Sequence, residues 1–182
     1  LYFRRPTVGD AEFCVEALSD QLTADGQGID VDHLPTAEAY RESFANLRWD
    51  MLIGVDRETD QAVGWTSLVE ATVARYSGAM SIGLVVHPAS RGRSFGRHLL
   101  GAGISLWRQR IAGHHTGTEL LVGTAVDNLA VQHIMSQLGY EPEPDVSSYE
   151  APNGQVFESY WYRCGPSTRP PKVFLSRSES HG

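Results

Sequence analysis

The feature of the sequence that most constrains its fold is a turn, rich in glycine and arginine, that joins an apolar strand to a long helix. Residues 80–86 form an apolar run of strand length, and residues 95–112 show the hydrophobic periodicity of a helix. Between them, residues 91–97 read Arg-Gly-Arg-Ser-Phe-Gly-Arg. Such a turn leaves backbone N–H groups unpaired at the helix N-terminus, where the helix dipole adds partial positive charge. The sequence therefore predicts an anion site here, to which three arginines add full charges.

Two familiar nucleotide-binding turns do not fit this segment. A P-loop carries a Lys-Ser/Thr pair after its last glycine, whereas Arg97 and His98 follow Gly96. A dinucleotide-binding turn needs three glycines in Gly-x-Gly-x-x-Gly order, which the sequence lacks here. A tight strand-to-helix turn with solvated arginines stays open as the purely structural alternative.

The order of the other elements indicates an α+β fold, because helices do not alternate strictly with strands. We expect further strands over residues 1–5, 51–55, 62–70 and 119–125, and a closing hairpin over 149–154 and 156–163. Helices are expected after Asp10, after Thr36, and after Asp127 or Asn128. The Gly- and Asp-rich segment 24–32 is interpreted as a loop.

Length and charge limit the classes of function. The 182 residues, 41% of them hydrophobic, fit one domain over 1–164, followed by a Pro- and Ser-rich tail or strap over 165–182. A net charge of -7 argues against nucleic acid as a partner. We find neither a membrane-length apolar run nor a signal-peptide pattern, so we expect a cytoplasmic protein without a membrane partner. Cys14 and Cys164 lack the spacing of a metal site, and we expect no metal.

Three segments in the right order resemble one known family. The segment Arg91–Gly96 resembles the Arg/Gln-x-x-Gly-x-Gly/Ala signature of the GNAT-superfamily N-acetyltransferases, and residues 84–88 resemble that family's run into the signature. Residues 128–140, with Asn at a helix start and Leu-Gly-Tyr at its end, resemble its second motif. The resemblance implies a GNAT-like three-layer α+β fold. Its mixed, mostly antiparallel central sheet has a splayed strand pair and is flanked by helices.

The resemblance also implies a reaction and a co-substrate. We expect acetyl-CoA (coenzyme A) as co-substrate, with its pantetheine arm between the splayed strands, and direct transfer of an acetyl group to the primary amine of a small molecule. Asn128 has the alternative role of a plain helix N-cap. The cofactor-binding residues that the resemblance implies are Leu84, Val85, Val86, Arg91, Gly92, Arg93, Ser94, Phe95, Gly96, Arg97 and Asn128.

The sequence departs from the family pattern at two positions. Ser94 replaces the first glycine of the signature, and we expect cofactor binding to persist unless this residue needs a positive φ. Met135 stands where the family often has a tyrosine that protonates the leaving thiolate, and methionine has no proton to donate.

The catalytic candidates are therefore chosen by position along the chain. Met80 and Ser81 stand where the family's base often lies, so Glu70, at the end of the preceding strand, becomes the candidate base. Tyr76, in the following turn, becomes the candidate acid. The alternatives are a solvated strand-end charge for Glu70 and a packing tyrosine for Tyr76.

The acceptor pocket is expected to lie between the first two helices, the turn 71–79 and the closing hairpin. Asp25, Asp30 and Asp32 could attract a cationic acceptor there, or could belong to a solvated loop. Two other functions stay open, a protein or peptide N-acetyltransferase with an open groove and a non-catalytic acyl-CoA-binding module. The sequence is also compatible with a homodimer.

Overall fold

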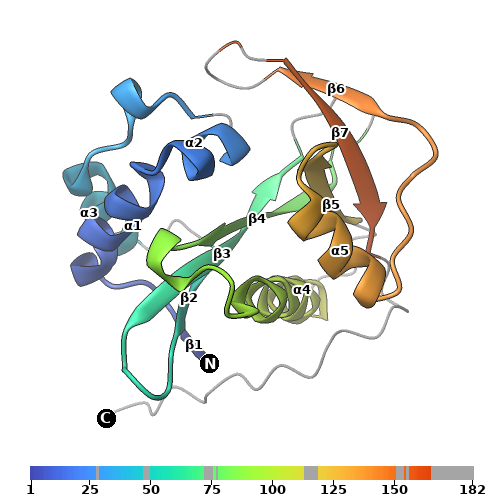
Figure 1. Cartoon of the computed structure of the whole chain (residues 1–182). Helices are drawn as coiled ribbons and strands as arrows, with labels where there is room; N and C mark the ends of the chain where they lie inside the picture. The colour runs from blue at the N-terminus through green and yellow to red at the C-terminus, as the bar shows by residue number, and fades with distance from the viewer. Residues whose placement is uncertain are drawn as a thin grey trace.

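The structure, a computed structural model, describes residues 1–27, 29–46, 50–71, 76, 78–112, 119–150, 154 and 156–164. The described strands form one seven-stranded sheet in the order β1-β2-β3-β4-β5-β7-β6 (Figure 1). Neighbouring strands run antiparallel except β4 and β5, which are parallel. The predicted mixed, mostly antiparallel α+β sheet is confirmed. The expected tail over 165–182 lies outside the described residues.

The predicted elements agree closely with the observed ones, and β4 and the long helix α4 have the predicted bounds. The strands are β1 (Tyr2–Arg4), β2 (Asp50–Val55), β3 (Ala62–Glu70), β4 (Met80–Val86), β5 (Leu120–Ala125), β6 (Ser147–Glu150) and β7 (Val156–Arg163). The helices are α1 (Ala11–Leu18), α2 (Gln21–Gln27), α3 (Ala37–Ala45), α4 (Phe95–Ala112) and α5 (Leu129–Gln137), with short 3-10 turns at Val8–Asp10, Val31–His33 and Pro88–Ser90.

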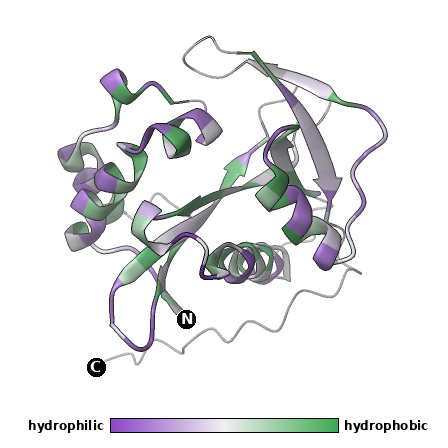
Figure 2. Ribbon diagram, viewed as in Figure 1, coloured by the Kyte–Doolittle hydropathy of each residue, from purple (hydrophilic) through white to green (hydrophobic). Residues whose placement is uncertain are grey.

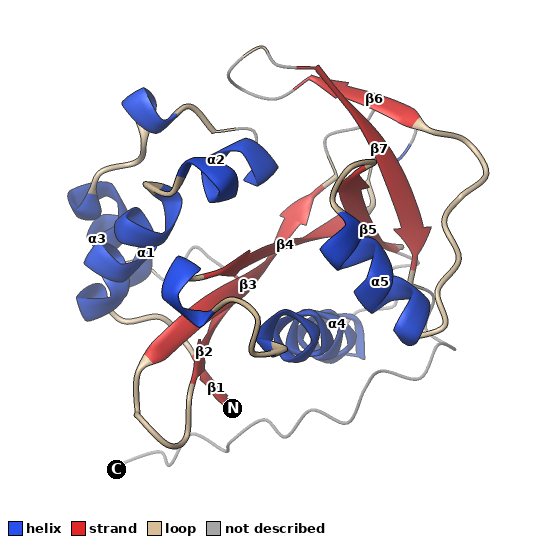
Figure 3. Cartoon of the chain, viewed as in Figure 1, coloured by secondary structure: helices blue, strands red, loops and turns tan. Residues whose placement is uncertain are grey.

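The sheet separates two layers of helices (Figure 3). Helices α4 and α5 cover one face, where the fully buried Trp107 packs among residues of α5, β5 and β7. Helices α1 and α3 pack on the other face, against β2, Trp65 and Val85. Figure 2 shows hydrophobic residues along the central strands and mixed hydropathy on the helices around them, as expected when each helix buries one side.

Local capping explains where several helices begin and end. The Thr36 side chain accepts a hydrogen bond from the Ala39 N–H, and the Asn128 side chain accepts one from the Val131 N–H, as predicted. Gly139, at φ +79°, ends α5 in the left-handed conformation that suits glycine. The prediction for Asp10 is wrong in its detail, because its carboxylate does not cap α1. That carboxylate instead accepts two bonds of 2.7 Å from Arg4.

The prediction of a loop over residues 24–32 is also wrong. Helix α2 covers Gln21–Gln27, and a 3-10 turn follows at Val31–His33. The Asp20 carboxylate starts α2 by accepting bonds from the N–H and the hydroxyl of Thr23, at 2.9 and 3.0 Å. Thr23 and Ala24 are buried, so tertiary packing overrides the low helix propensity of a Gly- and Asp-rich segment.

Candidate active site

The predicted splay lies between β4 and β5. The two strands pair only at Met80–Leu120 and Ser81–Leu121, although both continue for several residues. On its other side β4 pairs with β3 along its full length, without a register shift. We use the term splay for the region in which β4 and β5 are separated. Its closed end is at Ser81–Leu121, and its open end is toward Val86 and the glycine-rich turn.

The register decides which backbone groups of β4 face the splay. The His87 N–H donates to the Val63 carbonyl at 2.9 Å, which fixes the alternation of the antiparallel ladder between β3 and β4. The backbone of Val85 therefore points to its partner Trp65, whereas the backbone groups of Leu84 and Val86 point into the splay. All three residues were expected to bind pantetheine through their backbones. For Val85 this prediction is wrong, because its backbone groups face β3.

One side chain already reaches this inner edge of β4. The Gln27 amide nitrogen, at the end of α2, donates to the Leu84 carbonyl at 3.2 Å. Sequence reasoning missed Gln27, because segment 24–32 had been interpreted as a loop. The helical spacing of Asp20, Thr23 and Gln27 is the signal that could have found it.

The glycine-rich turn contains two left-handed residues just before α4. Gly92 has φ +76°, a conformation that glycine adopts without strain. Ser94 has φ +61°, so it takes the torsion that the first glycine of the family signature would supply. The chain then enters α4 at Phe95, and the first backbone N–H groups of α4 lie where the sequence predicts an anion site.

The arginine side chains of the turn do not act together as expected. Arg91 bonds to the Asp20 carboxylate and the Thr23 hydroxyl on α2. Arg93 bonds to Asp56 at 2.7 Å. The hydrogen bond from Arg91 holds the pKa of Asp20 below its ordinary value. Two of the three full charges are thus paired with carboxylates.

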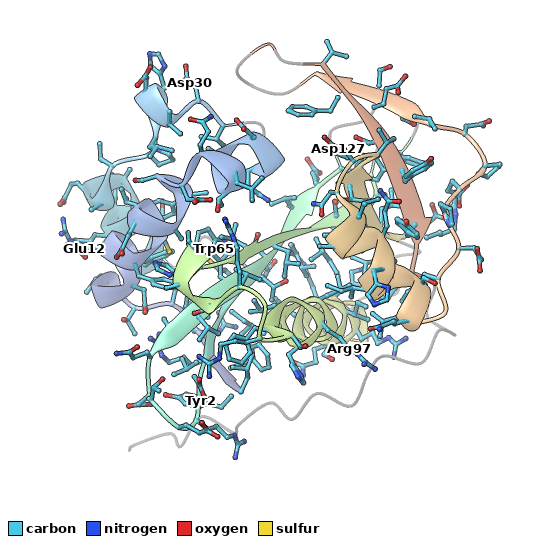
Figure 4. All side chains as sticks on the ribbon, in the orientation of Figure 1. Tyr2, Glu12, Asp30, Trp65, Arg97 and Asp127 are labelled. Atoms are coloured by element: carbon cyan, nitrogen blue, oxygen red, sulfur yellow. The ribbon has the colours of Figure 1, made fainter. Side chains whose placement is uncertain are left out.

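The remaining residues of the turn have simpler surroundings. Phe95 lies under the Arg93 guanidinium, 4.6 Å from its ring centroid. Arg97 is exposed on the first turn of α4 (Figure 4). A Cβ at Gly96 would lie 3.3 Å from Ile134 on α5 and 3.6 Å from Val86 on β4. The smallness of Gly96 therefore lets the start of α4 pack closely against α5 and the end of β4.

The two catalytic candidates lie on opposite faces of the sheet. Strand alternation places Glu70 on the same side as Leu68, which packs with α4. Tyr76 is buried against Leu121 and Trp161 on the other face, with its ring centroid 5.4 Å from that of Trp161. The position of Glu70 does not favour the predicted role of base, because its side chain faces away from Tyr76. Tyr76 lies beside the closed end of the splay.

Met135 is fully buried against Leu100 and Ile104 of α4, so it is a packing residue. The side-chain oxygen of Asn128 accepts the helix-cap bond at 3.3 Å, which is the structural role left open for it. In the described ranges, no cluster of three His, Cys, Asp or Glu residues could hold a metal ion. No helix within those ranges is long and apolar enough to cross a membrane.

The sequence and the fold are both similar to those of known proteins. A family model described as an acetyltransferase (GNAT) domain matches residues 1–141. The chain is similar in structure to a ribosomal-protein-alanine N-acetyltransferase from Brucella melitensis, at 18% identity and TM-score 0.69, covering 90% of this chain and 99% of that chain. No curated protein matches the sequence.

Two further solved structures have the same fold. One is a ribosomal-protein-S5-alanine acetyltransferase from Vibrio fischeri, at 14% identity and TM-score 0.70, covering 92% of this chain and 94% of that chain. The other is a spermidine N-acetyltransferase from Vibrio cholerae in complex with CoA and spermine, at 15% identity and TM-score 0.66, covering 88% and 94%. At such identities these likenesses show the fold.

Proposed function

Because the chain belongs to the GNAT acetyltransferase family, we propose that it transfers an acetyl group from acetyl-CoA to the primary amine of a small molecule. The observation that carries this proposal is the splay between β4 and β5, with a helix N-terminus at its open end. A strand edge and an anion site in line suit a ligand with an amide-bearing arm and a pyrophosphate.

The residues present fit such a ligand. Val86 offers its backbone N–H and C=O, and Leu84 the second lone pair of its C=O beside the Gln27 bond, to the two amides of a pantetheine arm, as a neighbouring strand would. The turn from Arg91 to Arg97 offers the amides at the start of α4 to the phosphates, with Gly92 and Ser94 in left-handed conformations that aim them. When bound, acetyl-CoA supplies a thioester that a neutral amine attacks directly.

The position of Leu84 suits charge stabilisation. Leu84 lies nearer the closed end of the splay than Val86, so it lies farther from the phosphate site. We assign its N–H to the carbonyl oxygen of the acyl group, where negative charge develops during attack. No side-chain nucleophile is needed for this step.

Proton transfer to the leaving thiolate is assigned to Tyr76. Met135 is a buried packing residue with no proton to donate, whereas Tyr76 lies on the face opposite α4, against Leu121 at the closed end. Replacing Tyr76 by Phe is expected to lower kcat with unchanged affinity for coenzyme A. A pH–rate profile identical to that of the wild type would remove Tyr76 from this role.

A second candidate function is acetylation of a peptide or protein N-terminus. Its support is the fold shared with the two ribosomal-protein alanine acetyltransferases. The non-catalytic alternative, an acyl-CoA-binding module, would use the same splay and differs only in turnover.

One experiment separates these three functions. Purified protein is mixed with acetyl-CoA and either a panel of small amines or an alanine-starting peptide, and thiol release is followed. Coenzyme A binding is measured in parallel by calorimetry. Release with small amines supports the first proposal, and release with the peptide alone supports the second. Tight binding without release on any amine would overturn both enzyme functions and leave the binding module.

A further inference from the structure

We propose that Gln27, Ser67 and Trp161 form the acceptor site at the closed end of the splay, and that this site takes a monoamine, an acceptor without a second positive charge. The inference rests on the proposed function and names the substrate class of the same site. Its parts come from α2, β3 and β7, none of which belongs to the glycine-rich turn.

Two glycines mark the level of this site. Gly83 on β4 and Gly123 on β5 each lie two residues beyond the closing pair Ser81–Leu121. A Cβ on Gly83 would lie 2.6 Å from the Ser67 hydroxyl oxygen. A Cβ on Gly123 would lie 2.8–3.0 Å from three ring atoms of Trp161. The Ser67 hydroxyl therefore lies directly over the β4 backbone, and the Trp161 indole lies directly over the β5 backbone, on the two strands that border the splay.

Both side chains lie on the face of the sheet opposite α4. Leu121, two residues before Gly123, packs with Trp161 and Tyr76 and not with the α4 cluster. Val85, two residues after Gly83, packs with α1 and α3. Because side chains alternate along a strand, Ser67 and Trp161 share this face with Tyr76, the proposed proton donor.

Gln27 supplies the third side. Its amide donates to the carbonyl of Leu84, the residue next to Gly83. Helix α2 is also tied to the glycine-rich turn, because Asp20 and Thr23 bond to Arg91. A ligand entering from this side therefore meets the carboxamide of Gln27 beside the backbone group that we assign to the acyl carbonyl.

The buried polar side chains that the described strands place on this face are neutral, and the charged Arg163 beside Leu121 is paired with Glu119 and Glu143. Ser67, Ser81 and Ser159 present hydroxyl groups and are 6%, 9% and 6% exposed. Among the described residues, the buried indole N–H of Trp161 has no hydrogen-bond partner. Hydroxyls and an indole can orient a polar group, but they do not compensate a second desolvated ammonium group.

The nearby carboxylates are already engaged or lie elsewhere. Asp20, just before α2, pairs with Arg91, Asp25 on α2 accepts from Gln21 at 2.7 Å, and Asp30 bonds to His33 at 2.9 Å. Asp127 is exposed in the turn that follows β5 (Figure 4). In sequence, the connections 71–79 and 151–155 contain one arginine and no carboxylate. A polyamine would thus bring a charge that this face leaves unpaired.

The charge-specific test is a pair of matched substitutions on α2. In the wild type, kcat/KM for alanine amide is expected to exceed that for spermidine by about tenfold, the effect of one missing ion pair. Gln27→Glu adds a carboxylate at the site and is expected to lower this ratio by about tenfold. Leu22→Glu adds the same charge to the same helix at an exposed position, and is expected to leave the ratio unchanged.

Two outcomes overturn the inference without touching the proposed function. One is a wild type that acetylates spermidine at least as efficiently as alanine amide. The other is an equal response of the ratio to Gln27→Glu and Leu22→Glu. Failure of the proposed function is distinct, since it appears as coenzyme A binding without turnover on either amine, and the inference then falls with it.

Substitution of the other two residues tests the placement of the site. Ser67→Ala and Trp161→Phe are expected to raise the KM for alanine amide, with coenzyme A affinity unchanged by calorimetry. Both variants keep most of the side-chain volume, so folding is checked by urea unfolding on the same samples. An unchanged acceptor KM in both folded variants would remove Ser67 and Trp161 from the site.

Discussion

At the scale of single residues, the site depends on backbone torsions and ion pairs that single substitutions can alter. Ser94 holds a left-handed torsion at φ +61° with a side chain that normally avoids it. Arg91 and Arg93 orient α2 and Asp56 and do not extend freely to solvent. We therefore expect the turn to bind anions mainly through its backbone, while its paired arginines hold the turn in shape.

The strain at Ser94 leads to a graded prediction. Ser94→Gly relieves about 1 kcal/mol of strain but adds a similar chain entropy to the unfolded state, so stability is expected to change little. Ser94→Val places a β-branched residue at a positive φ and is expected to cost about 2 kcal/mol and to weaken coenzyme A binding. Urea unfolding and calorimetry measure both effects. The same change at exposed Ser136, on α5, is the control, and equal losses at both positions would contradict the strain.

Asp10 gives a prediction with a defined pH dependence. Burial raises the pKa of Asp10, but the bonds from Arg4 and Thr7 outweigh this and lower the pKa below its ordinary value. The stabilisation is therefore complete above the unfolded pKa of about 3.9, and is lost as the pH falls through the lower folded value.

Replacing Asp10 by Asn is accordingly expected to cost about 3 kcal/mol of unfolding free energy at neutral pH, because it breaks a largely buried ion pair. The difference from the wild type shrinks below a pH of about 4. Urea unfolding at neutral and acidic pH measures this, with the exposed Glu158→Gln on β7 as control. A loss that is the same at both pH values would show that the Arg4 pair is not its source.

At the scale of elements, strand alternation and helix packing decide which groups meet. The alternation along β3 places Ser67 and Glu70 on opposite faces, and the ladder between β3 and β4 leaves Leu84 and Val86 facing the splay. Helix α4 lies close to α5 and to the end of β4 because Gly96 has no side chain.

The position of Glu70 predicts a kinetically silent substitution. Glu70→Gln is expected to leave kcat and coenzyme A affinity within about twofold of the wild type, because the carboxylate lies on the α4 face. The measurement is a pH–rate profile beside that of Tyr76→Phe. Loss of the acidic limb of the profile in Glu70→Gln would restore Glu70 as the base.

Packing at Gly96 predicts a loss that grows with side-chain size. Gly96→Ala brings a methyl group to 3.3 Å from the flexible end of Ile134, which can shift slightly. Gly96→Leu must move α4 away from α5 and β4, and is expected to weaken coenzyme A binding at least about tenfold. Calorimetry measures both variants. Equal affinity in wild type and Gly96→Leu would remove α4 from the cofactor site.

At the scale of the whole molecule, one sheet carries two separate apolar layers, and each contains one cysteine. Cys14 lies in the cluster of α1, α3 and β2, and Cys164 in the cluster of α4, α5 and β7. Burial raises the pKa of each thiol to about 12. Thiol reactivity therefore reports separately on the two sides of the sheet.

Native protein at a pH of about 8 is expected to react with a disulfide reagent only very slowly, since about one thiol in ten thousand is ionised. In a urea series, Cys14 and Cys164 are expected to become reactive at the same urea concentration, because both layers pack on one sheet. Peptide mapping of the labelled cysteines measures this. Labelling of one cysteine well before the other would show that the two layers unfold separately.

The sequence by itself determined the elements and the family, because their signals are local. Each signal can be recognised from a few neighbouring residues. Examples are the apolar run 80–86, the helix cap at Thr36 and the turn from Arg91 to Gly96. These signals predicted the order of elements along the chain and an anion site at the turn, and the family resemblance implied the splayed pair. They did not predict helix α2, because this helix is stabilised by burial and not by the helix propensity of its residues.

Only the tertiary structure decided which atoms face the site. Arg91 bonds to Asp20 across 71 positions, and Gln27 reaches Leu84 across 57. The register with β3 decides that the backbone groups of Leu84 face the splay and that those of Val85 face β3. Adjacent residues do not encode this register. Hydrophobic patterns fix which face of a strand is buried, but long-range pairing selects the groups that meet there.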